Sequence, residues 1–153
     1  MSNVTWQAYG TADNLIGTAS INSLADGSGV ILDQVDNRTD KKRFGDLLII
    51  LGADVTSVGT DARIDVYLVP APDGTNYPDP PGSTAADVTE GYYVGYISSV
   101  KRAGTVTNFL SGVLRGIELP PTKFKLVVFN ELGASFGASG HTVSLYRYGE
   151  AVA

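Results

Sequence analysis

The stretch of residues 62–82 constrains the fold more than any other part of the chain. Its first half, residues 62–69, alternates apolar side chains with polar or aromatic ones, which predicts a β-strand with one buried and one exposed face. The second half holds five of the seven prolines in the sequence, and each removes a backbone donor: Pro70, Pro72, Pro78, Pro80 and Pro81. We therefore predict a strand followed by an irregular, proline-stiffened loop, residues 70–91, that projects from the surface.

Short apolar or alternating segments make up the rest of the chain, with turns between them. The sequence has 18 glycines and only 18% charged residues, a composition that suits many short strands better than helices. Residues 44–51 are nearly all apolar, which predicts a central strand buried on both faces. Further strands are expected at residues 4–9, 29–36, 92–100, 105–110, 113–119, 123–130 and 141–148, with one or two short pieces within 15–24.

Together these segments predict an all-β chain of eight to ten short strands with little or no helix. Residues 108–115 have some helical spacing, but glycines at positions 112 and 116 confine it. A length of 153 residues is typical of one domain, here residues 1–153. The number of strands and the long loop at residues 70–91 favour an antiparallel two-sheet sandwich of the jelly-roll type over an immunoglobulin-like arrangement.

Charge and composition argue against several classes of protein. Eleven basic and sixteen acidic residues give a formal net charge of −5, whereas a nucleic-acid binder needs a basic surface. The absence of cysteine removes disulfides and thiolate chemistry. The first ten residues do not resemble a signal peptide, and the longest apolar run, residues 47–51, is far shorter than the roughly 20 residues that span a bilayer. We expect a soluble protein that binds neither nucleic acid nor membrane.

Few residues are suited to catalysis. His141 is the only histidine, and the sequence predicts no nucleophile elbow that would present a serine to it. An ordinary histidine at a strand edge is therefore expected. Asp46 and Asp65 lie on successive predicted strands and could serve a hydrolase only if they share an open cleft. A structural role is favoured, with Asp46 paired to Arg63 or to a backbone donor, because burying an uncompensated carboxylate is costly.

Metal binding has a similarly weak basis. The acidic residues at positions 33, 36 and 40 lack the spacing of a calcium loop, and those at 73, 79, 87 and 90 fall in an exposed loop, where calcium binding stays open. We predict no catalytic residue, no cofactor and no metal.

Contact with another protein is the role that the remaining features favour. Arg38, Lys41, Lys42 and Arg43 place four positive charges in six residues, which either steer the domain toward an acidic surface or blunt a sheet edge. Tyrosines are abundant on the predicted outward faces, and tyrosine is enriched at protein interfaces and in sugar-binding grooves. The first ten residues form a second candidate contact arm. The predicted contact residues are Trp6, the four basic residues above, Pro72, Asp73, Asn76, Tyr77, Pro78, Pro80 and Pro81.

Two groups of residues carry a family resemblance. One is VYLVP at residues 66–70 followed by DGTNY at 73–77, and the other is LPPTKFK at 119–125 followed by NELG at 130–133 and SG at 139–140. Together they resemble small virion proteins of tailed bacteriophages, in particular capsid decoration or cement proteins. The similarity is diffuse and spans most of the chain, and its motifs are structural.

The resemblance implies a non-enzymatic jelly-roll protein that is made in the host cytoplasm and sits on the outer surface of the virion capsid. As a homotrimer it would bind the major capsid protein, bridge neighbouring coat subunits and resist the pressure of packaged DNA. The stiff proline-rich loop agrees with this role, because preorganisation lowers the cost of ordering a contact. Jelly rolls also host lectins, so a carbohydrate-binding module of a phage tail or fibre is the alternative.

Overall fold

The computed structural model describes residues 4–6, 9–17, 19–55, 58–59, 61–78, 91–98 and 109–152. This part of the chain is all-β and contains no helix, so it has no helix that could cross a membrane. The strands are β1 (Val4–Trp6), β2 (Asp13–Asn14), β3 (Ser28–Ile31), β4 (Val35–Asp36), β5 (Phe44–Val55), β6 (Arg63–Ala71), β7 (Tyr92–Ser98), β8 (Phe109–Glu118), β9 (Lys123–Glu131), β10 (Thr142–Tyr148) and β11 (Glu150–Val152).

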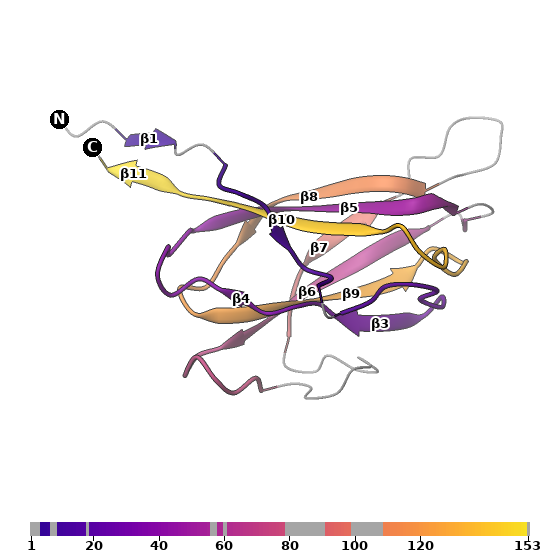
Figure 1. Ribbon diagram of the computed structural model, residues 1–153, viewed down its shortest axis with the longest axis horizontal. Helices are drawn as coiled ribbons and strands as arrows, with labels where there is room; N and C mark the ends of the chain where they lie inside the picture. The colour runs from indigo at the N-terminus through magenta and orange to yellow at the C-terminus, as the bar shows by residue number, and fades with distance from the viewer. Residues whose placement is uncertain are drawn as a thin grey trace.

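Two antiparallel sheets face each other in a sandwich (Figure 1). One has the strand order β2-β10-β5-β8, and the other has the order β3-β9-β6-β7 with β4 also paired to β9. The first strands of the chain thus pair with the last ones in reverse order: β2 with β10, β3 with β9, β5 with β8 and β6 with β7. This is a long hairpin rolled into two layers, so the predicted jelly-roll sandwich is confirmed.

The core lies between the two sheets and follows the predicted alternation. On β6, Ile64, Val66 and Leu68 are buried against the facing sheet, and β9 and β10 supply their own alternate residues in the same way. Each such side chain contributes about 1.5–3 kcal/mol when removed from water. The buried face predicted for residues 62–69 is therefore correct.

Several predicted elements differ from the structure. The apolar strand β5 is central in its sheet, but only its inward residues, such as Leu47 and Ile49, are fully buried, while Ile50 is exposed on the outer face. The predicted strand 29–36 is split into β3 and β4, because the four steps from Ile31 to Val35 oppose only three steps on β9. Residues 15–17 and 19–24 belong to no strand, and the described residues 109–115 are extended in β8.

Pro70 was predicted to begin the loop, and this was wrong. It lies inside β6, paired with Phe124 of β9. The pairing of β6 with β7 ends at Leu68 and Tyr92, so Pro70 occupies a stretch that has a ladder on one side only. A proline is tolerated at such an edge because its missing N–H is not needed there.

The two ends of the chain form a ribbon of their own. β1 pairs with β11 in antiparallel register, with Val4 opposite Val152 and Trp6 opposite Glu150. Figure 1 shows this ribbon extending from the sandwich in continuation of β10. Strand β11 was not predicted, because residues 150–152 carry no alternating pattern of sufficient length.

Candidate functional site

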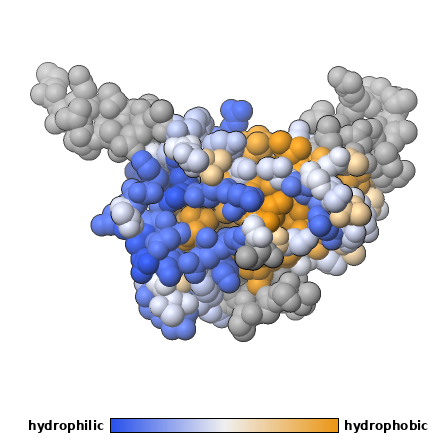
Figure 2. Space-filling model, viewed as in Figure 1, coloured by the Kyte–Doolittle hydropathy of each residue, from blue (hydrophilic) through white to orange (hydrophobic). Residues whose placement is uncertain are grey.

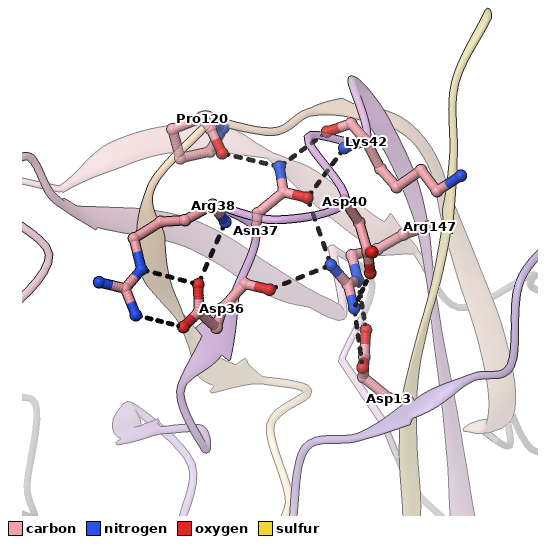
Figure 3. Close-up of polar contacts among 8 residues, drawn as sticks. All are labelled: Asp13, Asp36, Asn37, Arg38, Asp40, Lys42, Pro120 and Arg147. Atoms are coloured by element: carbon pink, nitrogen blue, oxygen red, sulfur yellow. Dashed lines mark hydrogen bonds and ion pairs between the residues drawn. The ribbon is translucent and has the colours of Figure 1, made fainter. Parts of the chain in front are cut away.

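A buried asparagine organises the basic loop after β4. Asn37 is fully buried, and its Nδ2 donates to the carbonyl oxygens of Lys42 and Pro120, both at 2.8 Å. Its Oδ1 accepts from the backbone N–H of Lys42 at 2.9 Å and from Nη1 of Arg147 at 3.2 Å (Figure 3). These hydrogen bonds close the loop and join it both to the segment after β8 and to β10.

Arg147 is the second anchor of this network. Its Nε and Nη2 donate to the two carboxylate oxygens of Asp13 on β2 at 2.6 and 3.2 Å, and Nη2 lies 3.7 Å from a carboxylate oxygen of Asp40 (Figure 3). The side chain of Arg147 is only 14% exposed. A forked, mostly buried pair of this kind fixes orientation as well as charge. Arg147 therefore ties β2, β10 and the basic loop together.

The predicted basic cluster is interleaved with carboxylates. Arg38 lies 2.6 Å from a carboxylate oxygen of Asp36, and its hydrogen bonds hold the pKa of that carboxyl well below its ordinary value. Arg43 lies 3.8 Å from a carboxylate oxygen of Glu118. Lys41 is exposed and has a φ of 47°, in the left-handed region. The loop is thus held in one conformation that presents a cation to solvent.

The described start of the proline-rich loop is a tight turn. The N–H of Gly74, whose φ is 75°, donates to the carbonyl oxygen of Ala71 at 2.8 Å. The carboxylate of Asp73 accepts from the N–H groups of Asn76 and Thr75 at 2.7 and 2.8 Å and from Nδ2 of Asn76 at 2.6 Å. These bonds stabilise the ionised form and lower the pKa of Asp73.

Tyr77 holds the end of this segment against the sandwich. Its hydroxyl donates to Oε1 of Gln34 at 2.8 Å, and the ammonium of Lys125 lies 4.7 Å from the centre of its ring. Burial raises the pKa of Tyr77, and its ring packs beside Val69 and Val127 on the outer face of the sheet. Residues 72–78 therefore lie against the body of the protein, whereas Pro80 and Pro81 fall outside the described residues.

The predicted contact regions meet at one end of the sandwich. A Cβ at Gly74 would lie 3.2 Å from Nη1 of Arg38, so the proline-rich segment and the basic loop are neighbours. A Cβ at Gly149, directly before β11, would lie 3.7 Å from the backbone nitrogen of Arg43, so the terminal ribbon starts beside the same loop. We call residues 37–43, residues 72–78 and the β1–β11 ribbon the contact end. They lie at the left of Figure 1, and hydrophilic residues gather over the sandwich there in Figure 2.

Trp6 contributes its backbone to this end, paired with Glu150 in the ribbon. Its side chain falls outside the described part of the structure.

A tyrosine-lined groove lies at the opposite end of β6, on the outer face of its sheet. It is open to solvent, has a volume of about 740 Å³ and is lined by Asp61, Ala62, Arg63, Asp65, Tyr67, Tyr93, Tyr96 and Ser98. A β-bulge builds it, because β7 has one extra residue between Tyr93 and Gly95, where Val66 and Tyr67 of β6 are adjacent. The bulge brings Tyr93 and Tyr96 onto the same face, opposite Tyr67 and Asp65.

Asp65 forms the floor of this groove. Only 9% of the residue is exposed, and its two carboxylate oxygens accept from Nε of Arg63 at 2.9 and 3.1 Å. The hydroxyl of Tyr93 lies 3.4 Å from the same carboxylate, and burial together with this charge raises the pKa of Tyr93. The hydrogen bonds to Asp65 also raise the pKa of Arg63.

Asp46 lies in a separate cluster on the outer face of the other sheet. Its carboxylate accepts from the hydroxyls of Tyr9 at 2.9 Å and Tyr148 at 3.2 Å, and from the N–H of Gly116 at 2.9 Å. That N–H is available because β8 has one extra residue opposite Asp46, with Gly116 at a φ of 69°. The hydrogen bond to Asp46 raises the pKa of Tyr9. The predicted backbone donor for Asp46 is thus confirmed, while Arg63 pairs with Asp65 instead.

The carboxylates do not form a shared catalytic cleft. Asp46 and Asp65 lie on the outer faces of opposite sheets, with the hydrophobic core between them, so the predicted condition for a hydrolase is not met. His141 is also occupied, since its Nδ1 accepts from the N–H of Gly52 at 3.2 Å and its Nε2 lies 2.8 Å from the carbonyl oxygen of Gly137. Among the described residues, no group of three acidic or histidine side chains is placed to hold a metal ion.

Comparisons with known protein families, with curated proteins and with solved structures found no match to this chain.

Sequence reasoning missed the residues that assemble these sites. Arg147 and Asp13 are 134 positions apart, and no local pattern connects them. Tyr93 and Tyr96 differ by three positions, so simple alternation assigns them to opposite faces. The one available indication was Gly95 inside an alternating strand, since an isolated glycine there suggests a bulge.

Proposed function

We propose that this protein is a non-enzymatic virion protein that binds the outside of a phage head as a decoration or cement protein. The observation that carries the proposal is the convergence at the contact end. Three regions that the sequence marks as contact candidates, far apart along the chain, lie next to one another there, and hydrogen bonds hold two of them in place. Such a surface loses little conformational freedom on binding, which favours affinity.

The chemistry of the contact end suits a protein partner. It combines an exposed cation at Lys41, a tyrosine ring at Tyr77 and prolines that reduce the flexibility of the backbone. Tyrosine is enriched at protein interfaces, and a positive group steers association toward an acidic surface. The terminal ribbon adds strand edges that a coat subunit can pair with. Both ring nitrogens of His141 have backbone partners, and Asp46 and Asp65 lie on opposite sheets. These two observations support a role without catalysis.

In this proposal the protein binds the major capsid protein and acts as a homotrimer that bridges neighbouring coat subunits. The trimer and the partner follow from the resemblance to decoration proteins, and the contact end is the surface through which they would act.

The first experiment is to measure copies of the protein relative to the major coat protein in purified particles from its source. Near-equimolar copies support the decoration role, a handful of copies would indicate a tail or neck protein, and absence from particles refutes the proposal.

A second experiment tests the contact end directly. Heads that lack the protein are incubated with the purified chain, and bound copies are counted. Lys41→Glu and Tyr77→Ala should each reduce binding about tenfold or more, because tenfold corresponds to about 1.4 kcal/mol and the few residues that dominate an interface are each worth about 2 kcal/mol or more. Tyr96→Ala, at the other end of the sandwich, is the matched control and should bind normally. Equal binding by all variants would contradict the assignment of the contact end.

A further inference from the structure

The tyrosine groove has the features of a preformed ligand-binding site. Its floor is a charged side chain, Asp65, that is about nine-tenths buried and still borders the cavity. Protein ligand sites commonly enclose about 300–1,000 Å³ and combine aromatic walls with a few fixed polar groups, and this groove of about 740 Å³ has both. The basic loop and the terminal ribbon belong to the contact end, and none of their residues lines the groove.

The walls of the groove are held in place yet accessible. The ring of Tyr67 packs edge-to-face against Tyr93, with centres 5.3 Å apart, and against Phe129, with centres 5.6 Å apart. Tyr93 and Tyr96 are 52% and 54% exposed, so large parts of their rings remain open to solvent. The packed rings of Tyr67 and Tyr93 therefore lose little entropy when a ligand covers them.

Hydrogen-bonding groups of both kinds border these rings. Arg63 uses only its Nε in the hydrogen bonds to Asp65 that the described residues show, and its side chain is 42% exposed, so its Nη atoms can donate to a ligand. Asp65 and Asp61 supply acceptors, while the hydroxyls of Tyr96 and Ser98 can donate or accept.

We propose that this groove binds a neutral oligosaccharide built from hexose units. A pyranose has an apolar face of C–H groups that packs on an aromatic ring, and hydroxyls around its edge that both donate and accept hydrogen bonds. Among the described lining residues, one arginine and two aspartates give a net charge of −1, which disfavours phosphate, sulfate and uronic-acid ligands. A sugar is favoured over a protein partner because the polar groups lie in a concavity, which is typical of small-molecule sites.

The position of the groove makes this activity independent of the proposed attachment to a phage head. Arg63 and Ala71 are the two ends of β6, about 26 Å apart in an extended strand. The groove lies at the Arg63 end, and the contact end begins at the Ala71 end. A chain bound through its contact end would therefore keep the groove open to a cell-surface glycan.

The test is a titration of the full-length protein with maltohexaose, cellohexaose and a mannose trisaccharide. Binding is measured by calorimetry and by the chemical shifts of backbone amides. At least one probe should bind with a Kd between about 10 µM and 10 mM. Tyr96→Ala and Arg63→Gln should each weaken binding about tenfold or more. Tyr92→Ala is the matched control, because Tyr92 is an exposed tyrosine of the same strand outside the groove. Oligogalacturonate should bind more weakly than the neutral probes.

Three outcomes would overturn the proposal. Lack of saturable binding by every neutral probe at about 10 mM would do so. So would binding that persists in Tyr96→Ala but is lost in Tyr92→Ala, which would place the sugar elsewhere. A Tyr96→Ala variant that loses head attachment or self-association would show that the groove is a protein contact. Tyr96 is exposed, so this variant should fold, and a failure of glycan binding leaves the head-binding experiments above unaffected.

Discussion

Replacing Asn37 by alanine should be the most damaging single change at the contact end. The side chain is fully buried and makes four hydrogen bonds, two with Lys42 and one each with Pro120 and Arg147. A hydrogen bond contributes a net 0.5–1.5 kcal/mol on average, and a buried group left without a partner costs about 1–3 kcal/mol. Water can reach part of this loop and can replace some of these hydrogen bonds in the variant. We therefore expect the free energy of unfolding to fall by about 3 kcal/mol, well below the sum of the individual contributions.

The assay is thermal unfolding followed by circular dichroism. For a chain of this size about 1 kcal/mol shifts Tm by roughly 2–4 °C, so Asn37→Ala should lower Tm by about 6–12 °C. Asn22→Ala is the matched control, since Asn22 is exposed, and its effect should stay within about 0.5 kcal/mol. Hydrogen exchange adds a local readout, because the amide of Lys42 should lose protection in Asn37→Ala. A Tm within about 2 °C of the control would refute the role of Asn37 as the centre of the loop.

Two further predictions follow from the geometry. Gly52→Ala should destabilise the fold by about 1–3 kcal/mol or more in denaturant titrations, because the new Cβ would lie 2.7 Å from the Cα of Gly140 and would clash with the carbonyl oxygen of Ser139. Gly10→Ala is the control and should be close to neutral, because its Cβ would have its nearest contact at 3.7 Å. Similar unfolding midpoints for the two variants would contradict this prediction. Asp36 and Asp73 have pKa values below those of the unfolded chain, so the stability they provide is present above about pH 4 and is lost as pH falls through their folded values. The Asp36→Asn/Asp73→Asn double variant should therefore lose less Tm between about pH 5 and pH 3 than the parent chain, and an unchanged difference would count against these two carboxyls.

The sequence predicts the fold well because the pattern that specifies it is local. Alternation along β6, β9 and β10 assigns each residue to a face without knowledge of its neighbours, and the inward residues found there agree, although Val69 and Val127 on the outer face are buried as well. The same reasoning fails for β5, where apolar residues such as Ile50 continue onto the outer face and imitate a strand buried on both sides. The periodicity of a sequence shows which residues are hydrophobic, but it does not show whether another part of the protein packs over them.

The sites depend on long-range contacts that no local pattern contains. The contact end requires Arg38 to lie beside Gly74 and Gly149 to lie beside Arg43, and these contacts arise only when the hairpin rolls up. The residues predicted for contact were chosen for their type, and the sequence could not indicate that they share one surface. The anchor of that surface, Asn37, gives no sign in the sequence because an asparagine after a strand usually indicates an exposed turn.

Both outer-face clusters are products of β-bulges at glycine. The bulge at Gly95, with φ of 140°, turns Tyr96 to the same side as Tyr93, and the bulge at Gly116, with φ of 69°, aims an N–H at Asp46. An extra residue on one strand changes which side chains face solvent beyond it while leaving the core face of the partner strand intact. A jelly roll can therefore change the chemistry of one outer face without disturbing its hydrophobic interior. The groove and the 72–78 segment of the contact end lie at opposite ends of β6, so this one strand fixes the separation between them.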